Sequence, residues 1–278
     1  MEKTGSSVSY QTAAARKIKM DKYYKMASLF LFFLLWEAFC RINLSFGWVN
    51  EKFLPMPTGI IGAAVSYIEE GLLWEHVLIS VRRVLKGYLS GVFLALILGS
   101  LIASFRLMDN LFSPLLNLFG PIPVMAFLPV FILWFGIGEI SKSALIAYTT
   151  AIYMVSCVTE GIRNTEPVLI RSASSLGATQ WQIFWKVKFQ SAFPGIFLGM
   201  KGALGAAFGA MVVAEMMGAS TGLGYIIVFS KNWFKMNDMI MAAVLIGLLY
   251  SLFFAVLTVI ESNLFRWKIL SKGGAVEK

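Results

Sequence analysis

Long uncharged stretches constrain this chain more than any other feature of its sequence. Residues 87–105 contain 19 consecutive residues without a charged side chain, and residues 239–260 contain 22. About 20 apolar residues in a helix are enough to cross the hydrocarbon core of a bilayer. Because 58% of the 278 residues are hydrophobic and the mean hydropathy is +0.74, a soluble domain could not bury this much apolar surface. The sequence therefore predicts an integral membrane protein.

The charged and metal-binding residues exclude several function classes. The net charge is +9, but the basic residues flank apolar segments, which indicates contact with lipid headgroups and not with nucleic acid. His76 is the single histidine, and Cys40 and Cys157 both lie in apolar segments, so we expect no metal site and no disulfide framework. The sequence has no Walker-type glycine loop and no nucleophile–base pair. We therefore expect no catalytic residues and no bound cofactor.

Apolar segments at six places predict an all-α protein with six transmembrane helices. They cover approximately residues 26–40, 87–105, 115–137, 143–159, 193–214 and 239–260. A polar basic tail (1–25) precedes this transmembrane domain (26–265), and a second basic tail (266–278) follows it. A cleavable signal peptide is the alternative at the N-terminus, but no small-x-small cleavage site follows the first apolar segment.

The basic residues also predict the orientation. On the six-helix interpretation, 15 of them lie on the side of the two tails and eight on the other side. Basic residues are enriched in cytoplasmic segments, so we expect both termini in the cytoplasm of a cell whose inner or plasma membrane holds the protein.

The connections between spans vary in length. Residues 106–110 predict a short cytoplasmic turn. Residues 42–86 predict an extracytoplasmic elbow with an amphipathic helix over 60–67, and residues 218–238 predict an extracytoplasmic re-entrant turn.

Three prolines interrupt the third apolar segment. Pro121, Pro123 and Pro129 remove backbone donors, so we expect a kink there. Broken helices in membranes are tolerated where they are buried in protein or line a cavity. The segment is therefore a candidate part of a translocation path, and a bend that serves packing alone is the alternative.

The fifth apolar segment, residues 193–214, combines small residues with an ionisable side chain. Its glycines recur every three or four residues, which favours close helix packing. Lys201 lies inside the segment and Glu215 ends it, so both are candidates for the translocation path. A cation at Lys201 could attract an anion. A structural ion pair near a membrane face is the alternative for both, and also for Arg83 and Glu139.

The polar stretch at residues 163–195 carries two helix-start signals. Thr165 is expected to cap a first helix that stops at Gly177. Thr179 and Gln182 have the spacing of a capping box, in which each side chain satisfies a free backbone N–H at the start of a second helix. Pro194-Gly195 is expected to end the loop.

Aromatic residues follow the second capping signal. Trp181 and Phe184 would share one side of this second helix. An interfacial amphipathic hairpin without a partner is the alternative interpretation of the whole stretch.

The order helix, glycine turn, helix, Pro-Gly resembles the cytoplasmic coupling loop of ABC importer permeases. That family has Glu-Ala-Ala, three residues and Gly, and the corresponding positions here are Arg171-Ser172-Ala173 and Gly177. Arg171 departs from the acidic residue of the pattern. Three further segments look like the sequence pattern of the subfamily that imports nitrate, taurine and aliphatic sulfonates. They are Pro121-Ile122-Pro123, Ser80-x-x-Arg83-x-x-x-Gly87 and Gly222-Leu223-Gly224.

The resemblance implies a type I importer fold with a coupling loop at residues 163–193. It also implies a second permease copy, two ATP-binding subunits that dock on the loop and hydrolyse ATP, and an extracytoplasmic solute-binding protein. The chain itself would be no enzyme. The alternatives are an ion-gradient-driven secondary transporter, for which no inverted repeat is apparent, and a membrane-bound enzyme.

Overall fold

The computed structural model describes the backbone of residues 3–265, and the side chains from residue 23 onward in that range except Lys25 and Leu29. The predicted tail at 266–278 lies outside the described residues. Within the described range the elements are helices: α1 (Lys3–Phe46), η1 (Glu51–Phe53), α2 (Pro57–Glu69), α3 (Leu72–Ser104), α4 (Arg106–Phe119), α5 (Val124–Phe135), α6 (Glu139–Arg163), α7 (Pro167–Ser175), α8 (Gln180–Ile183), η2 (Phe184–Lys188), α9 (Phe189–Gly218), α10 (Leu223–Asn232) and α11 (Met236–Leu264).

Five helical stretches of the described chain are long and apolar enough to cross a membrane. They are Met26–Phe46, Leu72–Ser104, Glu139–Arg163, Gln180–Gly218 and Met236–Leu264. The pair α4 and α5 adds a sixth if it counts as one broken span. The all-helical class is confirmed, and five of the six predicted spans overlap these five stretches.

The third predicted span differs most from its prediction. We expected one kinked helix, but α4 and α5 are separate helices that meet at an angle of 110°. Pro121 and Pro123 lie in the break, and Pro129 lies inside α5. The predicted turn at 106–110 is wrong, because these residues form the start of α4.

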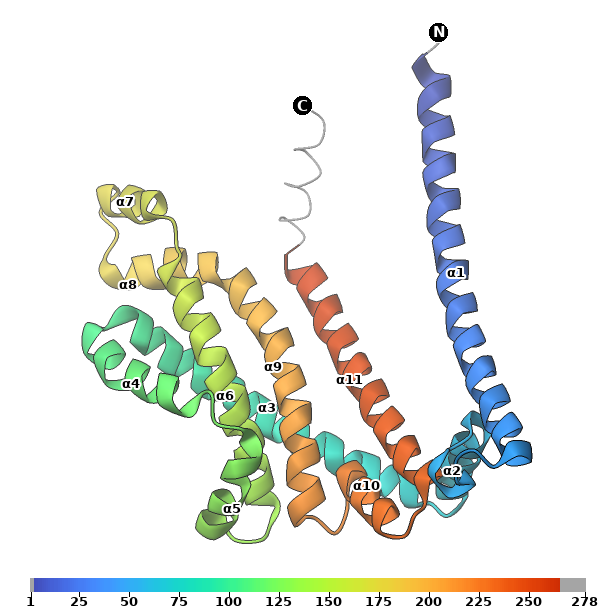
Figure 1. The fold of residues 1–278 in the computed structure, drawn as a ribbon. Helices are drawn as coiled ribbons and strands as arrows, with labels where there is room; N and C mark the ends of the chain where they lie inside the picture. Colours follow the sequence, from blue (N-terminus) through green and yellow to red (C-terminus); the bar gives the residue numbers. More distant parts are fainter. Residues whose placement is uncertain (1–2, 266–278) are drawn as a thin grey trace.

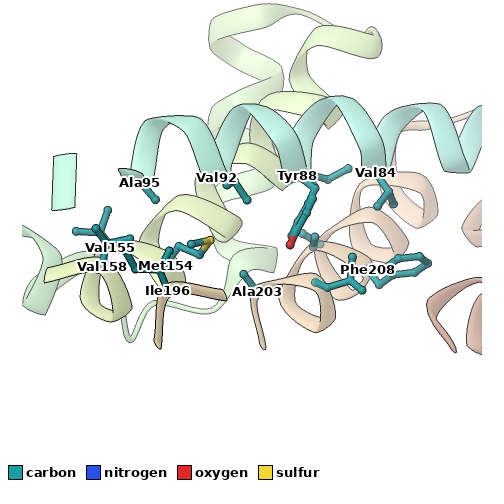
Figure 2. Close-up of a cluster of buried hydrophobic side chains, with 14 of the residues drawn as sticks. Val84, Tyr88, Val92, Ala95, Met154, Val155, Val158, Ile196, Ala203 and Phe208 are labelled. Atoms are coloured by element: carbon teal, nitrogen blue, oxygen red, sulfur yellow. The ribbon is translucent and has the colours of Figure 1, made fainter. Parts of the chain in front are cut away.

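The core of the bundle lies where α3, α6 and α9 meet. Buried side chains of α3 face α6 and α9, as Figure 2 shows. The Tyr88 hydroxyl at the centre donates a hydrogen bond of 2.8 Å to the carbonyl of Met200. The cluster includes Val84, Val92 and Ala95 of α3, Met154, Val155 and Val158 of α6, and Ile196, Ala203 and Phe208 of α9.

Glycines bring these three helices close together. A Cβ on Gly91 would lie 2.5 Å from the Ala147 carbonyl oxygen of α6, and a Cβ on Gly199 would lie 2.7 Å from Cys157 Cβ. The expectation of close packing is confirmed for Gly199 of α9. It does not hold for Gly195 and Gly209, where no atom lies within 4 Å of the added Cβ.

Short helices cover the end of the bundle away from α7. The predicted elbow contains α2, and the predicted re-entrant turn contains the helix α10 (Figure 1). Glu37 of α1 accepts hydrogen bonds from the backbone N–H and the hydroxyl of Thr58, at 3.2 and 2.9 Å. A carboxylate at this position stabilises the first turn of α2.

Both ends of the helical bundle can be followed in Figure 1. The start of α1, the end of α11 and the helices α7 and α8 lie at one end, named here the loop end. The helices α2 and α10 lie at the other, named here the α10 end. Helix α1 stands apart from α3, α6 and α9, and its side chains from Phe30 to Leu35 are exposed within the single chain.

We expect Gly91→Ala to destabilise the fold by about 1–3 kcal/mol, because the added methyl group must displace backbone atoms of α6. Gly62→Ala is the matched control, since a Cβ on this helical glycine meets nothing within 4 Å. Thermal unfolding of the purified full-length chain in detergent measures both. Equal unfolding temperatures for the two variants would contradict the close contact of α3 with α6.

Candidate functional site

The first helix of the polar loop, α7, begins one residue later than expected. Glu166 occupies the N-cap position and Pro167 is the first helical residue. Proline suits this position because its fixed φ is helical and no N–H is needed there. Thr165 is buried instead, and its hydroxyl donates to the carbonyls of Ile162 at 2.9 Å and Lys188 at 3.4 Å. The predicted cap at Thr165 is therefore wrong, and this residue ties the loop to η2.

The end of α7 agrees with its prediction. Gly177 has φ +79°, in the left-handed region that a residue with a side chain rarely adopts. The Ala178 N–H donates to the Ala173 carbonyl at 3.1 Å, and the Gly177 N–H donates to the Ser174 carbonyl at 3.0 Å. These two bonds form a Schellman motif, which satisfies the last carbonyls of the helix.

The capping box at Thr179 is also confirmed. The Gln182 N–H donates to the Thr179 hydroxyl at 3.3 Å, and the Thr179 N–H donates to the Gln182 side chain at 2.9 Å. The chain between the two helices is therefore held by hydrogen bonds on both sides of Gly177.

A continuous helix follows the capping box. It runs from Gln180 to Gly218 through α8, the π-helical turn η2 and α9. Pro194 lies inside this helix, so the predicted end of the loop at Pro194-Gly195 is wrong. Ala192 and Ile196 on either side are buried in the core, and their packing offsets the hydrogen bond that Pro194 cannot make. At 1.5 Å per residue the contour length of this helix is about 58 Å, and its direction changes between α8 and α9 (Figure 1).

The helix α7 exposes apolar side chains. Val168 is 58% exposed and Leu176 is 88% exposed, while Arg171 and Ser172 are exposed beside them. Ala173 is half-buried. Exposed apolar side chains of this kind on a polar loop are typical of a surface that binds another protein.

Trp181 and Phe184, which we expected on one side of the second helix, line the same groove. The other wall of this groove is the last part of α3. Their predicted contact with an ATP-binding subunit stays a prediction.

A buried ion cluster lies at the far end of the long helix. Glu215 has no exposed surface, yet its carboxylate accepts hydrogen bonds from Arg83 Nη1 at 2.9 Å, Ser80 Oγ at 2.8 Å and the Gly224 N–H at 2.8 Å. An ionised carboxylate can be buried in this way only when several donors replace its water.

Arg83 is the centre of the cluster. Its guanidinium forms a bidentate pair with Glu139, with distances of 2.7 and 2.6 Å, and it also donates to the Thr221 carbonyl at 2.7 Å. Lys142 contacts the same Glu139 at 3.1 Å. The positive charges of Arg83 and Lys142 therefore balance the negative charges of Glu139 and Glu215. These four residues join α3, α6 and α9.

The turn before α10 closes over Glu215. The Gly222 N–H donates to His76 Nδ1 and the Leu223 N–H donates to Ser80 Oγ, both at 2.9 Å. Gly222 has φ +121°, and a Cβ there would lie 2.5 Å from the Glu215 carboxyl carbon. Only glycine fits both the backbone angle and the space at this position.

From the sequence we singled out three of these charged residues, but we did not predict that they contact one another. Arg83, Glu139 and Glu215 meet in one cluster, and His76 and Ser80 were not expected there. A signal was present, because His76, Ser80 and Arg83 are four and three residues apart and so share one face of α3.

Lys201 lies apart from this cluster. It is buried, forms an ion pair with Glu261 of α11, and lies 5.2 Å from the centre of the Phe254 ring. The sequence did not indicate Glu261, because it follows the predicted end of the last span. The contacts of Lys201 therefore agree with the alternative interpretation, in which this residue forms a structural ion pair.

A cavity of about 420 Å³ lies beside the α4–α5 break. Gly120 and Ile122 of the break line it, while Pro121, Pro123 and Pro129 are exposed and do not. Its other wall carries the hydroxyl side chains of α6, namely Tyr148, Thr149, Tyr153 and Ser156. Among the described residues, no group of three or more His, Cys, Asp or Glu side chains could hold a metal ion.

The fold and the site define a membrane-embedded transport component, with apolar spanning helices, a capped loop at one end and internal ion pairs at the other. A family model described as the binding-protein-dependent transport system inner membrane component matches residues 91–268. The chain belongs to this family, whose members are permease subunits of ABC importers. This membership decides against the gradient-driven carrier and implies an ATPase and a solute-binding partner.

Named relatives cover most of the chain. The putative aliphatic sulfonates transport permease protein SsuC of Bacillus subtilis is 30% identical over 267 residues, which are 96% of this chain and 97% of that protein. The taurine transport system permease protein TauC of Escherichia coli is 27% identical over 224 residues, or 79% and 80% of the two chains.

A solved structure has the same fold. The inward-facing MetNI methionine ABC transporter matches with a TM-score of 0.59 and 22% identity, over 70% of this chain and 95% of that one. At this level of identity the match concerns the fold alone.

We expect Arg83→Met to lower the stability of the folded chain by about 3–5 kcal/mol, because it leaves Glu215 buried without its cation. Arg82→Met is the matched control, since Arg82 is exposed on the same helix. The folded yield in membranes and the unfolding temperature in detergent measure the difference. If both variants behave like the unchanged chain, the cluster does not hold the bundle together.

Proposed function

We propose that this permease imports a small anionic solute of the sulfonate, taurine or nitrate class. The loop end faces the cytoplasm, where both termini lie, and binds a separate subunit that hydrolyses ATP. The α10 end faces a solute-binding protein. Two copies of this chain and two ATP-binding subunits form the membrane complex, so the chain itself needs no cofactor.

One observation carries this proposal: a single unbroken helix joins the capped loop to the buried ion cluster. Gln180 at the loop end and Glu215 at the α10 end belong to the same helical stretch. A stiff element with fixed contacts at both ends transmits a movement of one end to the other. Closure of the ATP-binding subunits against α7 would in this way reposition α3 and α6, which hold Glu215 through Arg83 and Glu139.

The cavity beside the α4–α5 break is our candidate for part of the translocation path. It offers hydroxyl groups from α6 and backbone groups from the break, which can contact a sulfonate without binding it tightly. Lys201 would act on the solute only indirectly, since its charge is already paired with Glu261. Glu215 would affect transport by fixing the position of the long helix.

The solute class rests on the names of the relatives, which include aliphatic sulfonates and taurine. We expect cells that express the complete transporter to accumulate labelled taurine or an alkanesulfonate in an ATP-dependent manner. The matched control is the same strain without this permease. Uptake that survives loss of the membrane potential but stops without ATP supports the proposal. Uptake that follows the ion gradient instead would overturn it.

Gly177→Val should uncouple ATP hydrolysis from the solute. A β-branched residue in the left-handed region costs about 1–2 kcal/mol, so the turn between α7 and the capping box would change direction. We expect normal insertion, weaker retention of the ATP-binding subunit during purification and no stimulation of hydrolysis by solute.

Gly177→Asn is the control for this experiment, because asparagine adopts the left-handed conformation far more easily than valine. It should keep most of the coupling. Normal subunit retention and normal stimulated hydrolysis in the valine variant would mean that residues 163–193 are not the coupling element.

A further inference from the structure

An apolar groove runs between the last part of α3 and the start of the long helix. Its volume is about 690 Å³, a size typical of cavities that hold organic ligands. Phe93, Ile97 and Leu101 of α3 form one wall, and Trp181, Phe184 and Trp185 form the other. Both walls belong to helical stretches that are apolar and long enough to span a membrane. The groove therefore lies at the level of lipid chains and at the root of the capped loop.

The walls of the groove are open in the described chain. The side chain of Trp181 is 71% exposed and that of Phe93 is 65% exposed. Tryptophan is enriched where the hydrocarbon core of a membrane meets the headgroups. Trp181 and Trp185 both line the groove. We therefore expect the end of the groove that holds these two indoles to lie at the height of lipid headgroups.

One basic side chain lines the groove. Lys188 is the only charged residue among the described residues that line it, and within that part of the chain no carboxylate forms an ion pair with Lys188. The hydroxyl side chains of Ser100 and Ser104 lie on the opposite wall, and Arg106 follows directly after the lining residue Phe105. The groove therefore suits a ligand with an apolar tail and an anionic head.

We propose that this groove binds an acyl chain of an anionic phospholipid, whose phosphate pairs with Lys188. The tail packs between Ile97 and Phe184, and the headgroup reaches the hydroxyl groups and the ammonium group at the open end. This site is separate from the path of the transported solute. It gives the loop end a contact with the membrane on the helix that carries the coupling signal.

The experiment uses the full-length chain in phosphatidylcholine vesicles that contain a small fraction of phosphatidylglycerol with a photoreactive group on one acyl chain. After illumination, peptide mass spectrometry locates the labelled residues. We expect labelling within residues 93–105 and 181–189. A phosphatidylcholine probe with the same acyl chain should label these residues about fivefold less, the factor expected from one basic residue near an anionic headgroup.

Two variants separate the contributions of charge and shape. Lys188→Gln should lower labelling by the phosphatidylglycerol probe to the level of the phosphatidylcholine probe. Lys186→Gln is the matched control, because Lys186 lies on the same helical turn but does not line the groove. Ile97→Trp, which fills the groove, should reduce labelling by both probes.

Three outcomes would overturn the proposal. Equal labelling by the two probes, in the chain with Lys188 and in Lys188→Gln, would mean that no anionic headgroup is recognised. Loss of labelling on addition of excess glycerol phosphate would assign the site to a soluble phosphate compound. Absence of label, together with a cross-link between two copies of Trp185→Cys, would mean that a second permease chain covers the groove. None of these results depends on the identity of the imported solute.

Discussion

The pairing of Arg83 with two carboxylates is the interaction on which the arrangement of the bundle depends. Side chains of Arg83 and Glu215 are almost completely buried, and the Arg83 guanidinium supplies the positive charge that an ionised Glu215 needs there. Such a pair adds little stability compared with apolar residues of similar size, but it tolerates only one alignment of its helices. Because Glu139 and the turn at 221–224 bind the same groups, α3, α6, α9 and α10 are fixed relative to one another at one end.

At the other end of the bundle, helix α7 has no buried residue, whereas Ile183 of α8 is buried. The turn between α7 and α8 is held by local hydrogen bonds, namely the Schellman motif at Gly177 and the capping box at Thr179. An element with a well-defined internal structure and little tertiary packing moves as a unit. The contrast between the ion cluster at one end and the exposed helix α7 at the other, connected by one long helix, is the physical basis of the coupling that we propose.

The sequence predicted those features that depend on neighbouring residues. Gly177 and Thr179 act through bonds that span at most five positions, and the spans follow from local hydrophobicity. Contacts between residues far apart in the sequence could not be predicted in this way, since Arg83 and Glu215, for example, are 132 residues apart. The prediction that Pro194-Gly195 ends the loop was wrong, because core packing keeps this part of the chain helical. Likewise, nothing local to Lys201 indicated Glu261 as its partner.

The separation of the cluster residues along the chain has a consequence for biosynthesis. Arg83 is made 56 residues before Glu139 and 132 residues before Glu215. At typical translation rates the second interval lasts on the order of ten seconds. Until Glu139 is made, Arg83 has neither of its carboxylate partners, and an unpaired charged residue in a transmembrane helix is costly. We therefore expect the α3 helix to remain near water, or beside the insertion machinery, until at least Glu139 has been made.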